Sequence, residues 1–123
     1  MLAARVSGAD AALFFFGAVQ HAGVRIGNFQ EPYITPAAIV ESICGLSLVL
    51  GVTAVFGYSF VAWRGALVAN LVPLAGVLLG MAALAAGRGP RTASSDLYHH
   101  IMLALIAVSV LFFGRAALDR GSV

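Results

Sequence analysis

Residues 35–57 read TPAAIVESICGLSLVLGVTAVFG, and this stretch decides the fold class of the chain. After Pro36 it contains a single charged side chain, Glu41, in an otherwise apolar run. A run of about 20 apolar residues is what a helix needs to cross a hydrocarbon core of ~30 Å. Its start is well marked, because Thr35 is a favourable capping residue and Pro36 suits the first helical turn. The stretch therefore predicts a transmembrane helix over residues 36–57.

Three other apolar stretches extend this pattern to the rest of the chain. They predict helices at 7–26, 60–86 and 96–118. The first stretch follows Arg5 and has a signal peptide as its rival interpretation, but Gln20 and His21 do not fit a small-residue cleavage site. The last begins after Ser95, a good capping residue. We therefore expect four membrane-spanning helices.

The composition supports this class. Hydrophobic residues make up 61% of the 123 positions and charged residues 10%, against roughly half and a quarter in soluble domains. Backbone groups in hydrocarbon must pair within their own segment, so these spans are helices. The seven basic residues are all arginines and form no basic run, which excludes a nucleic-acid partner. We expect an all-α integral membrane protein with one domain, residues 1–123.

Short connections between the spans predict an up-down-up-down bundle with both termini on one side. Arginines are in slight excess on that side, and basic residues favour the cytoplasmic face. The terminal side has Arg5, Arg64, Arg115 and Arg120, against Arg25, Arg88 and Arg91 on the loop side. The distribution predicts a cell-membrane protein with cytoplasmic termini.

The third span contains both a packing motif and a helix breaker. Gly76 and Gly80 form a GxxxG step, which is typical of close helix contacts within a chain or between copies. Pro73 removes a backbone donor and is expected to bend this helix. Asn70 is expected to face a neighbouring helix and to repair the kink.

Polar side chains fall at one depth near the loop-side ends of all four spans. His21 lies about 7 Å inside the first helix end, and Glu41 lies at a similar depth in the second. His99 and His100 lie about 5 Å inside the last helix, and Met81 about 9 Å inside the third. Ionisable groups within spans are costly and mark functional sites by default. We predict that His21, Glu41 and at least one of His99 and His100 surround one cavity.

Helical phase decides between the two adjacent histidines. His99 and His100 differ by about 100° around the helix, so they cannot both face inward equally. His100 shares a face with the small residues Ala104 and Ala107. We therefore predict that His100 faces the bundle interior.

Two structural interpretations of the polar residues remain open. Arg25 lies four residues after His21 and shares its face, so Glu41 could form a purely structural clasp with either of them. Met81 and Cys44 are typical of core packing as well as of ligand sites.

The run from Pro36 to Gly51, in which Glu41 is followed by Gly45 and Gly51, resembles the second helix of the DoxX-like group of small four-helix membrane proteins. The number and order of apolar helices are similar over most of the chain. The sequence-specific likeness is confined to this helix. The resemblance implies a four-helix bundle and an association with membrane subunits of quinone-coupled sulfur oxidation and redox-stress complexes.

The first functional hypothesis is a redox-associated membrane subunit that binds a quinone head group, a metal or a haem. Histidine exchanges protons near neutral pH, and a buried carboxylate can take the second proton of a quinol. The cofactor-binding candidates are His21, Arg25, Glu41, Met81, His99 and His100. The metal version would use His21, Glu41 and His100, whose mixed ligands suit zinc, iron or copper.

Two hypotheses from other classes compete with it. An enzyme acting on a lipid or other apolar substrate would use Glu41 as acid or base, with His21 or His100 as its catalytic partner. A non-enzymatic anchor or assembly subunit would use its glycine faces to dock helices of other membrane subunits or of a second copy. In either case the chain contacts the lipid bilayer.

Overall fold

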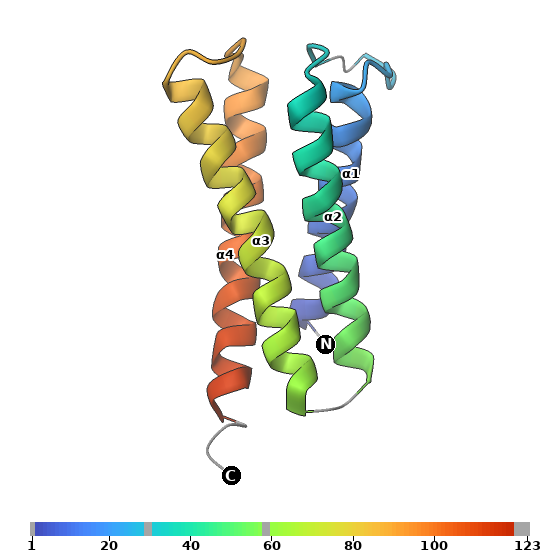
Figure 1. Cartoon of the computed structure of the whole chain (residues 1–123), viewed down its shortest axis with the longest axis vertical. Helices are drawn as coiled ribbons and strands as arrows, with labels where there is room; N and C mark the ends of the chain where they lie inside the picture. Colours follow the sequence, from blue (N-terminus) through green and yellow to red (C-terminus); the bar gives the residue numbers. More distant parts are fainter. Residues whose placement is uncertain (1, 29–30, 58–59, 120–123) are drawn as a thin grey trace.

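The computed structural model describes residues 2–28, 31–57 and 60–119, the last range with side chains from 62, and these residues form four α-helices (Figure 1). The helices are α1 (Leu2–His21), α2 (Thr35–Phe56), α3 (Phe60–Ala85) and α4 (Ala93–Asp119). All four are long and apolar enough to cross a membrane. The predicted all-α class and four-helix architecture are therefore confirmed.

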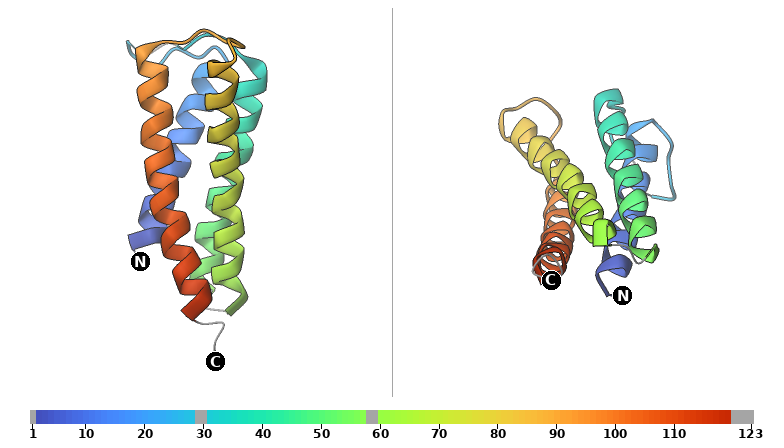
Figure 2. Two further views of the ribbon diagram at one scale, coloured as in Figure 1. Left: turned by 90° about the vertical axis from the view of Figure 1, so that its left-hand side faces the viewer. Right: turned by 60° about the horizontal axis from the view of Figure 1, so that its bottom comes forward.

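The helices form a ring in which sequence neighbours are antiparallel (Figures 1 and 2). α1 packs against α2 and α4, and α3 packs against the same two helices. The described ends of the chain, Leu2 and Asp119, lie at one end of the bundle, and the two longer connections lie at the other (Figure 1). Arg120, used above for orientation, lies outside the described residues.

The first helix begins at Leu2 and ends at His21, so both ends come earlier in the chain than the predicted bounds of 7–26. Arg5 does not delay its start, since this side chain is exposed on the outer face of the helix. Gly23 adopts a φ of 92°, a left-handed conformation that ends an α-helix and favours glycine. The other three helices match their predicted ranges within three residues.

The two predicted helix caps are wrong in detail. Thr35 is the first residue of α2, and the capping position belongs to Ile34, which makes no side-chain cap. At α4 the hydroxyl of Thr92 accepts a hydrogen bond from the Ser95 backbone N–H at 3.0 Å. This helix therefore begins at Ala93, three residues before the predicted start.

Apolar side chains fill the interior in two clusters, while others face outward. One cluster comprises Ala11, Phe14, Cys44, Leu48, Val77, Met102 and Ile106, and the other comprises Ala3, Val55, Ala66 and Phe113. Large apolar side chains such as Leu50, Leu79 and Leu111 are exposed on α2, α3 and α4. Outward-facing leucines on all of these helices are what contact with a lipid bilayer requires.

Pro73 lies inside α3, and a neighbouring helix compensates for its missing backbone donor. The proline leaves the carbonyl of Ala69 without its usual helical partner. The Ser47 hydroxyl of α2 donates a hydrogen bond to this carbonyl at 2.9 Å. Asn70 faces a neighbouring helix as predicted, but it accepts a hydrogen bond from Ser7 of α1 at 3.0 Å. The repair predicted for Asn70 is therefore made by Ser47.

Candidate functional site

A cavity of about 280 Å³ lies at the loop-side end of the bundle, where the α1–α2 pair and the α3–α4 pair diverge (Figure 1). All four helices and both longer connections contribute to its walls. Its polar lining residues are His21, Glu31, Glu41, Arg88, Ser95, Tyr98 and His99. The structure thus brings His21, Glu41 and one helix-four histidine around a single cavity, as predicted.

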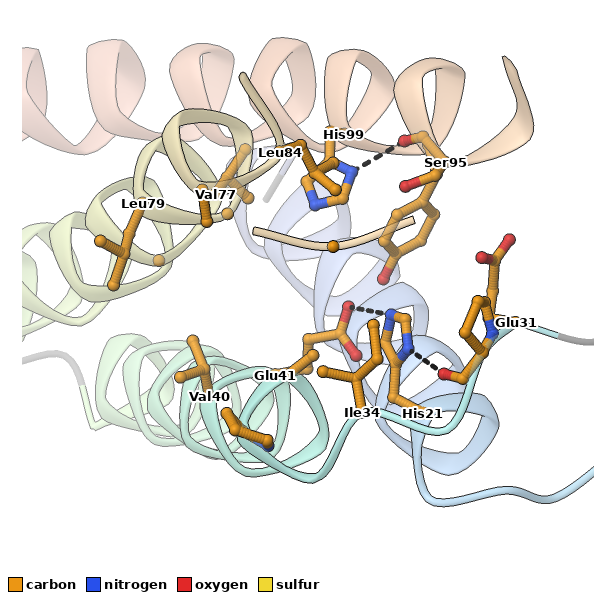
Figure 3. Close-up of a pocket in the computed structure, with 18 of the residues that line it drawn as sticks. His21, Glu31, Ile34, Val40, Glu41, Val77, Leu79, Leu84, Ser95 and His99 are labelled. Carbon is orange, nitrogen blue, oxygen red and sulfur yellow. Dashed lines mark hydrogen bonds and ion pairs between the residues drawn. The ribbon is translucent and has the colours of Figure 1, made fainter. Parts of the chain in front are cut away.

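His21 and Glu41 form one wall of this pocket (Figure 3). The Nε2 atom of His21 lies 3.9 Å from Oε1 of Glu41, and Nδ1 lies 3.0 Å from the carbonyl oxygen of Pro32. Because a carbonyl only accepts hydrogen bonds, Nδ1 must carry a hydrogen. In the neutral ring Nε2 of His21 is then an acceptor, and it faces Oε1 of Glu41, which also accepts. Protonation of the imidazole would turn this contact into an ion pair, since 3.9 Å is too long for a hydrogen bond.

Gly17 allows Glu41 and Tyr98 to meet against the backbone of α1. A Cβ atom at position 17 would lie 2.7 Å from Oε1 and 2.9 Å from Oε2 of Glu41, and would also contact the Tyr98 hydroxyl. This hydroxyl donates to the carbonyl of Leu13 at 2.9 Å, so it presents an oxygen to Glu41. Glu41 is only 8% exposed, and its Oε2 atom has no hydrogen-bond partner among the described residues. This oxygen is therefore a buried acceptor between Gly17 and the Tyr98 hydroxyl.

His99 lies across the pocket from the His21–Glu41 pair (Figure 3). Its Nδ1 lies 2.7 Å from the carbonyl of Ser95 and must donate to it, so Nε2 of the neutral ring accepts. Gly80 makes room for this ring, since a Cβ there would lie 3.1 Å from Nε2. Gly76 similarly lies against the Cys44 thiol. The GxxxG step is therefore a helix contact within the chain, one of the two predicted alternatives.

The choice of His100 as the interior histidine is wrong. His100 is exposed, and its Nδ1 bonds to the carbonyl of Asp96 at 2.7 Å. The inward face of α4 carries Met102 and Ile106, which share a face with His99. Large apolar side chains, rather than the small Ala104, fill the interior on this helix. His100 therefore cannot complete the metal set predicted with His21 and Glu41.

Three other predicted candidates lie away from the pocket lining. Arg25 is exposed and its Nε donates to the carbonyl of Gly27 at 3.3 Å. Met81 packs against the larger core cluster, of which Cys44 is a buried member.

Tyr98 lines the pocket but was not predicted as a site residue. Its position next to His99, near the start of α4, was a usable signal. Its ring meets His99 edge-on, with centroids 5.6 Å apart.

The pocket opens sideways between α2 and α3. On the α3 side its rim includes Leu79, which is 64% exposed, and on the α2 side it includes the exposed Pro36. Phe14, Val40 and Val77 give the deeper walls an apolar surface. Since both rim helices are suited to span the bilayer, the opening faces the region that lipid would occupy.

The polar end of the pocket holds both hydrogen-bond acceptors and donors. In neutral rings Nε2 of His21 and Nε2 of His99 accept, whereas Arg88 and the Ser95 hydroxyl can donate. Within the described ranges, no three His, Cys, Asp or Glu side chains are placed to hold a metal ion. The acceptors on the two facing walls suit an apolar molecule that donates hydrogen bonds.

Comparison with known proteins adds no further assignment, since no family model, curated protein or solved structure matches the chain. The DoxX-like resemblance stays a prediction from residues 36–51.

Proposed function

We propose that the pocket binds the head group of a quinol, a membrane-soluble aromatic diol, and accepts a proton from its hydroxyl group. Acceptors on facing walls of the pocket, in the His21–Glu41 pair and at Nε2 of His99, carry this proposal. Both pocket histidines direct Nδ1 at a backbone carbonyl, which leaves Nε2 as an acceptor in each neutral ring. Quinol hydroxyls donate hydrogen bonds, whereas quinone oxygens can only accept them. The neutral site therefore favours the reduced form of such a ligand.

The size and opening of the pocket fit this ligand class. Its volume of about 280 Å³ lies just below the roughly 300–1,000 Å³ typical of ligand sites. A single aromatic ring suits this space, and a haem macrocycle is too large for it. The opening between α2 and α3 would let an apolar tail extend past Leu79 into the bilayer. A ligand dissolved in the membrane could then enter without crossing water.

The His21–Glu41 pair would act as the proton acceptor. A carboxylate and an imidazole in contact can take up a proton near neutral pH. When quinol is oxidised, its two electrons would pass to a redox centre of a partner subunit, while one proton passes to the His21–Glu41 pair and the second to Nε2 of His99 across the pocket. The DoxX-like resemblance supports this role in a quinone-coupled complex. The arginine distribution supports cytoplasmic termini, with the pocket near the opposite membrane face.

Binding measurements on the full chain in lipid nanodiscs test the proposal. A short-tailed hydroquinone and the corresponding benzoquinone have nearly the same shape but opposite hydrogen-bonding character. We expect the hydroquinone to bind roughly tenfold more tightly, which corresponds to about 1.4 kcal/mol. Equal affinity, or a preference for the quinone, would overturn the proposed function.

A further inference from the structure

A second buried carboxyl group lies deeper in the bundle than the pocket. Asp10 of α1 is 0% exposed, and neither carboxyl oxygen has a hydrogen-bond partner among the described residues. Ser109 of α4 is also fully buried, and its hydroxyl has no such partner. An isolated carboxylate in an apolar interior is strongly disfavoured. Asp10 therefore needs either a bound cation or a proton.

Asp10 belongs to the same face of α1 as the pocket residues. Ser7, Asp10, Phe14, Gly17 and His21 follow one another at spacings of three and four, which places them on one side of a helix. The first four are buried, and His21 lines the pocket. This face therefore runs from the middle of the bundle to the His21–Glu41 pair.

The surrounding helices offer no cation to balance a charge on Asp10. The titratable side chains facing the interior are Glu41 and Cys44 on α2, and Tyr98 and His99 on α4. Over its described side chains, α3 contributes only the neutral Asn70 at this depth. Every arginine in the described part of the chain is exposed.

Full burial favours a proton over a metal cation. Hard metal cations require a shell of about six oxygen ligands, whereas a proton needs no space beyond the carboxyl group. A protonated Asp10 also gains an O–H donor, which can satisfy a nearby acceptor.

We propose that Asp10 holds an exchangeable proton in the middle of the bundle. Its carboxyl group lies on the face of α1 that leads to His21 and the pocket. The group takes up and releases this proton without electron transfer, so the proposal requires no quinol.

Infrared spectroscopy of the full chain in nanodiscs tests the proton on Asp10 without any ligand. A protonated carboxyl group gives a C=O stretch that shifts when H₂O is replaced by D₂O. We expect Asp10→Asn to remove one such band, and the exposed Asp119→Asn to leave it in place. An unchanged spectrum for Asp10→Asn would overturn the proposal.

Isotope labelling keeps the test valid if Asp10→Asn does not fold. In wild-type protein labelled with ¹³C at the aspartate carboxyl carbon, the band must shift, because Asp96 is paired with Arg91 at 2.9 Å and Asp119 is exposed. A band that does not shift would contradict the assignment. A band that disappears when sodium replaces potassium at constant ionic strength would indicate a sodium site instead and would also overturn it.

Because no quinol is present in any of these measurements, their results are independent of the binding test above.

Discussion

Gly17 of α1 lies directly against the carboxylate of Glu41 of α2, so closely that a Cβ at position 17 would lie 2.7 Å from Oε1. The Tyr98 hydroxyl occupies the other side of the same small space. A residue with no side chain is therefore what allows two helices to place their polar groups at the base of the pocket.

Substitution of this glycine should destabilise the bundle, although alanine is the better helix former. We expect Gly17→Ala to lower the free energy of unfolding by roughly 1–3 kcal/mol through overpacking. Gly8 on the same helix has no atom near its missing Cβ, so Gly8→Ala should stabilise by about 0.5–1 kcal/mol. Unfolding of both variants in mixed detergent micelles measures the difference. Equal stabilisation by both would show that position 17 is not crowded.

The Ser47 hydrogen bond should matter only while Pro73 is present. Ser47→Ala leaves the Ala69 carbonyl unpaired and should cost about 1 kcal/mol of unfolding free energy. In a Pro73→Ala background the backbone N–H of residue 73 can bond this carbonyl, so the same substitution should have little effect. A double-mutant cycle on these two positions measures the coupling. Additive effects would contradict the compensation.

The two adjacent histidines should differ in their effect on hydroquinone binding. His99→Ala removes an acceptor from the pocket wall and should weaken binding by roughly tenfold. His100→Ala changes an exposed side chain that does not line the pocket and should leave the affinity unchanged. Titration of both variants with hydroquinone in nanodiscs compares their affinities. A larger loss of affinity in His100→Ala than in His99→Ala would support the sequence-based choice of His100.

The rates of hydroquinone binding and release should depend on the size of residue 79, which lies at the opening between α2 and α3. Leu79→Trp places a larger ring at the opening between α2 and α3 and should slow both association and dissociation of hydroquinone severalfold. Leu78 is also exposed but does not line the pocket, so Leu78→Trp is the matched control. Stopped-flow kinetics compare the two. Unchanged rates for Leu79→Trp would place the entrance elsewhere.

The sequence was sufficient to predict the four helices, because apolar length alone selects a spanning helix. The convergence of His21 and Glu41 also followed, since depth along antiparallel helices is set by a fixed rise per residue. The helix ends were less predictable. Gly23, with its left-handed φ, ends α1 before Arg25 and removes that side chain from the site.

Rotational orientation was the feature that the sequence could not settle. His100 was favoured because small residues were expected inside, but a lipid-facing surface accepts small and large apolar residues alike. Asp10 was not among the predicted site residues. Only the placement of α1 shows that this carboxyl group is fully buried. The role of Ser47 likewise depends on the register between α2 and α3.

The most direct test of the central claim is hydroquinone binding by Glu41→Gln. The substitution keeps the size of the side chain but removes the acidic group, and one carboxyl oxygen becomes an N–H₂ donor. We predict that Glu41→Gln loses roughly tenfold in hydroquinone affinity and no longer prefers hydroquinone to benzoquinone, while the bundle stays folded and Asp119→Asn binds as wild type. Unchanged affinity and preference in folded Glu41→Gln would contradict the account and leave the His21–Glu41 pair as a structural clasp.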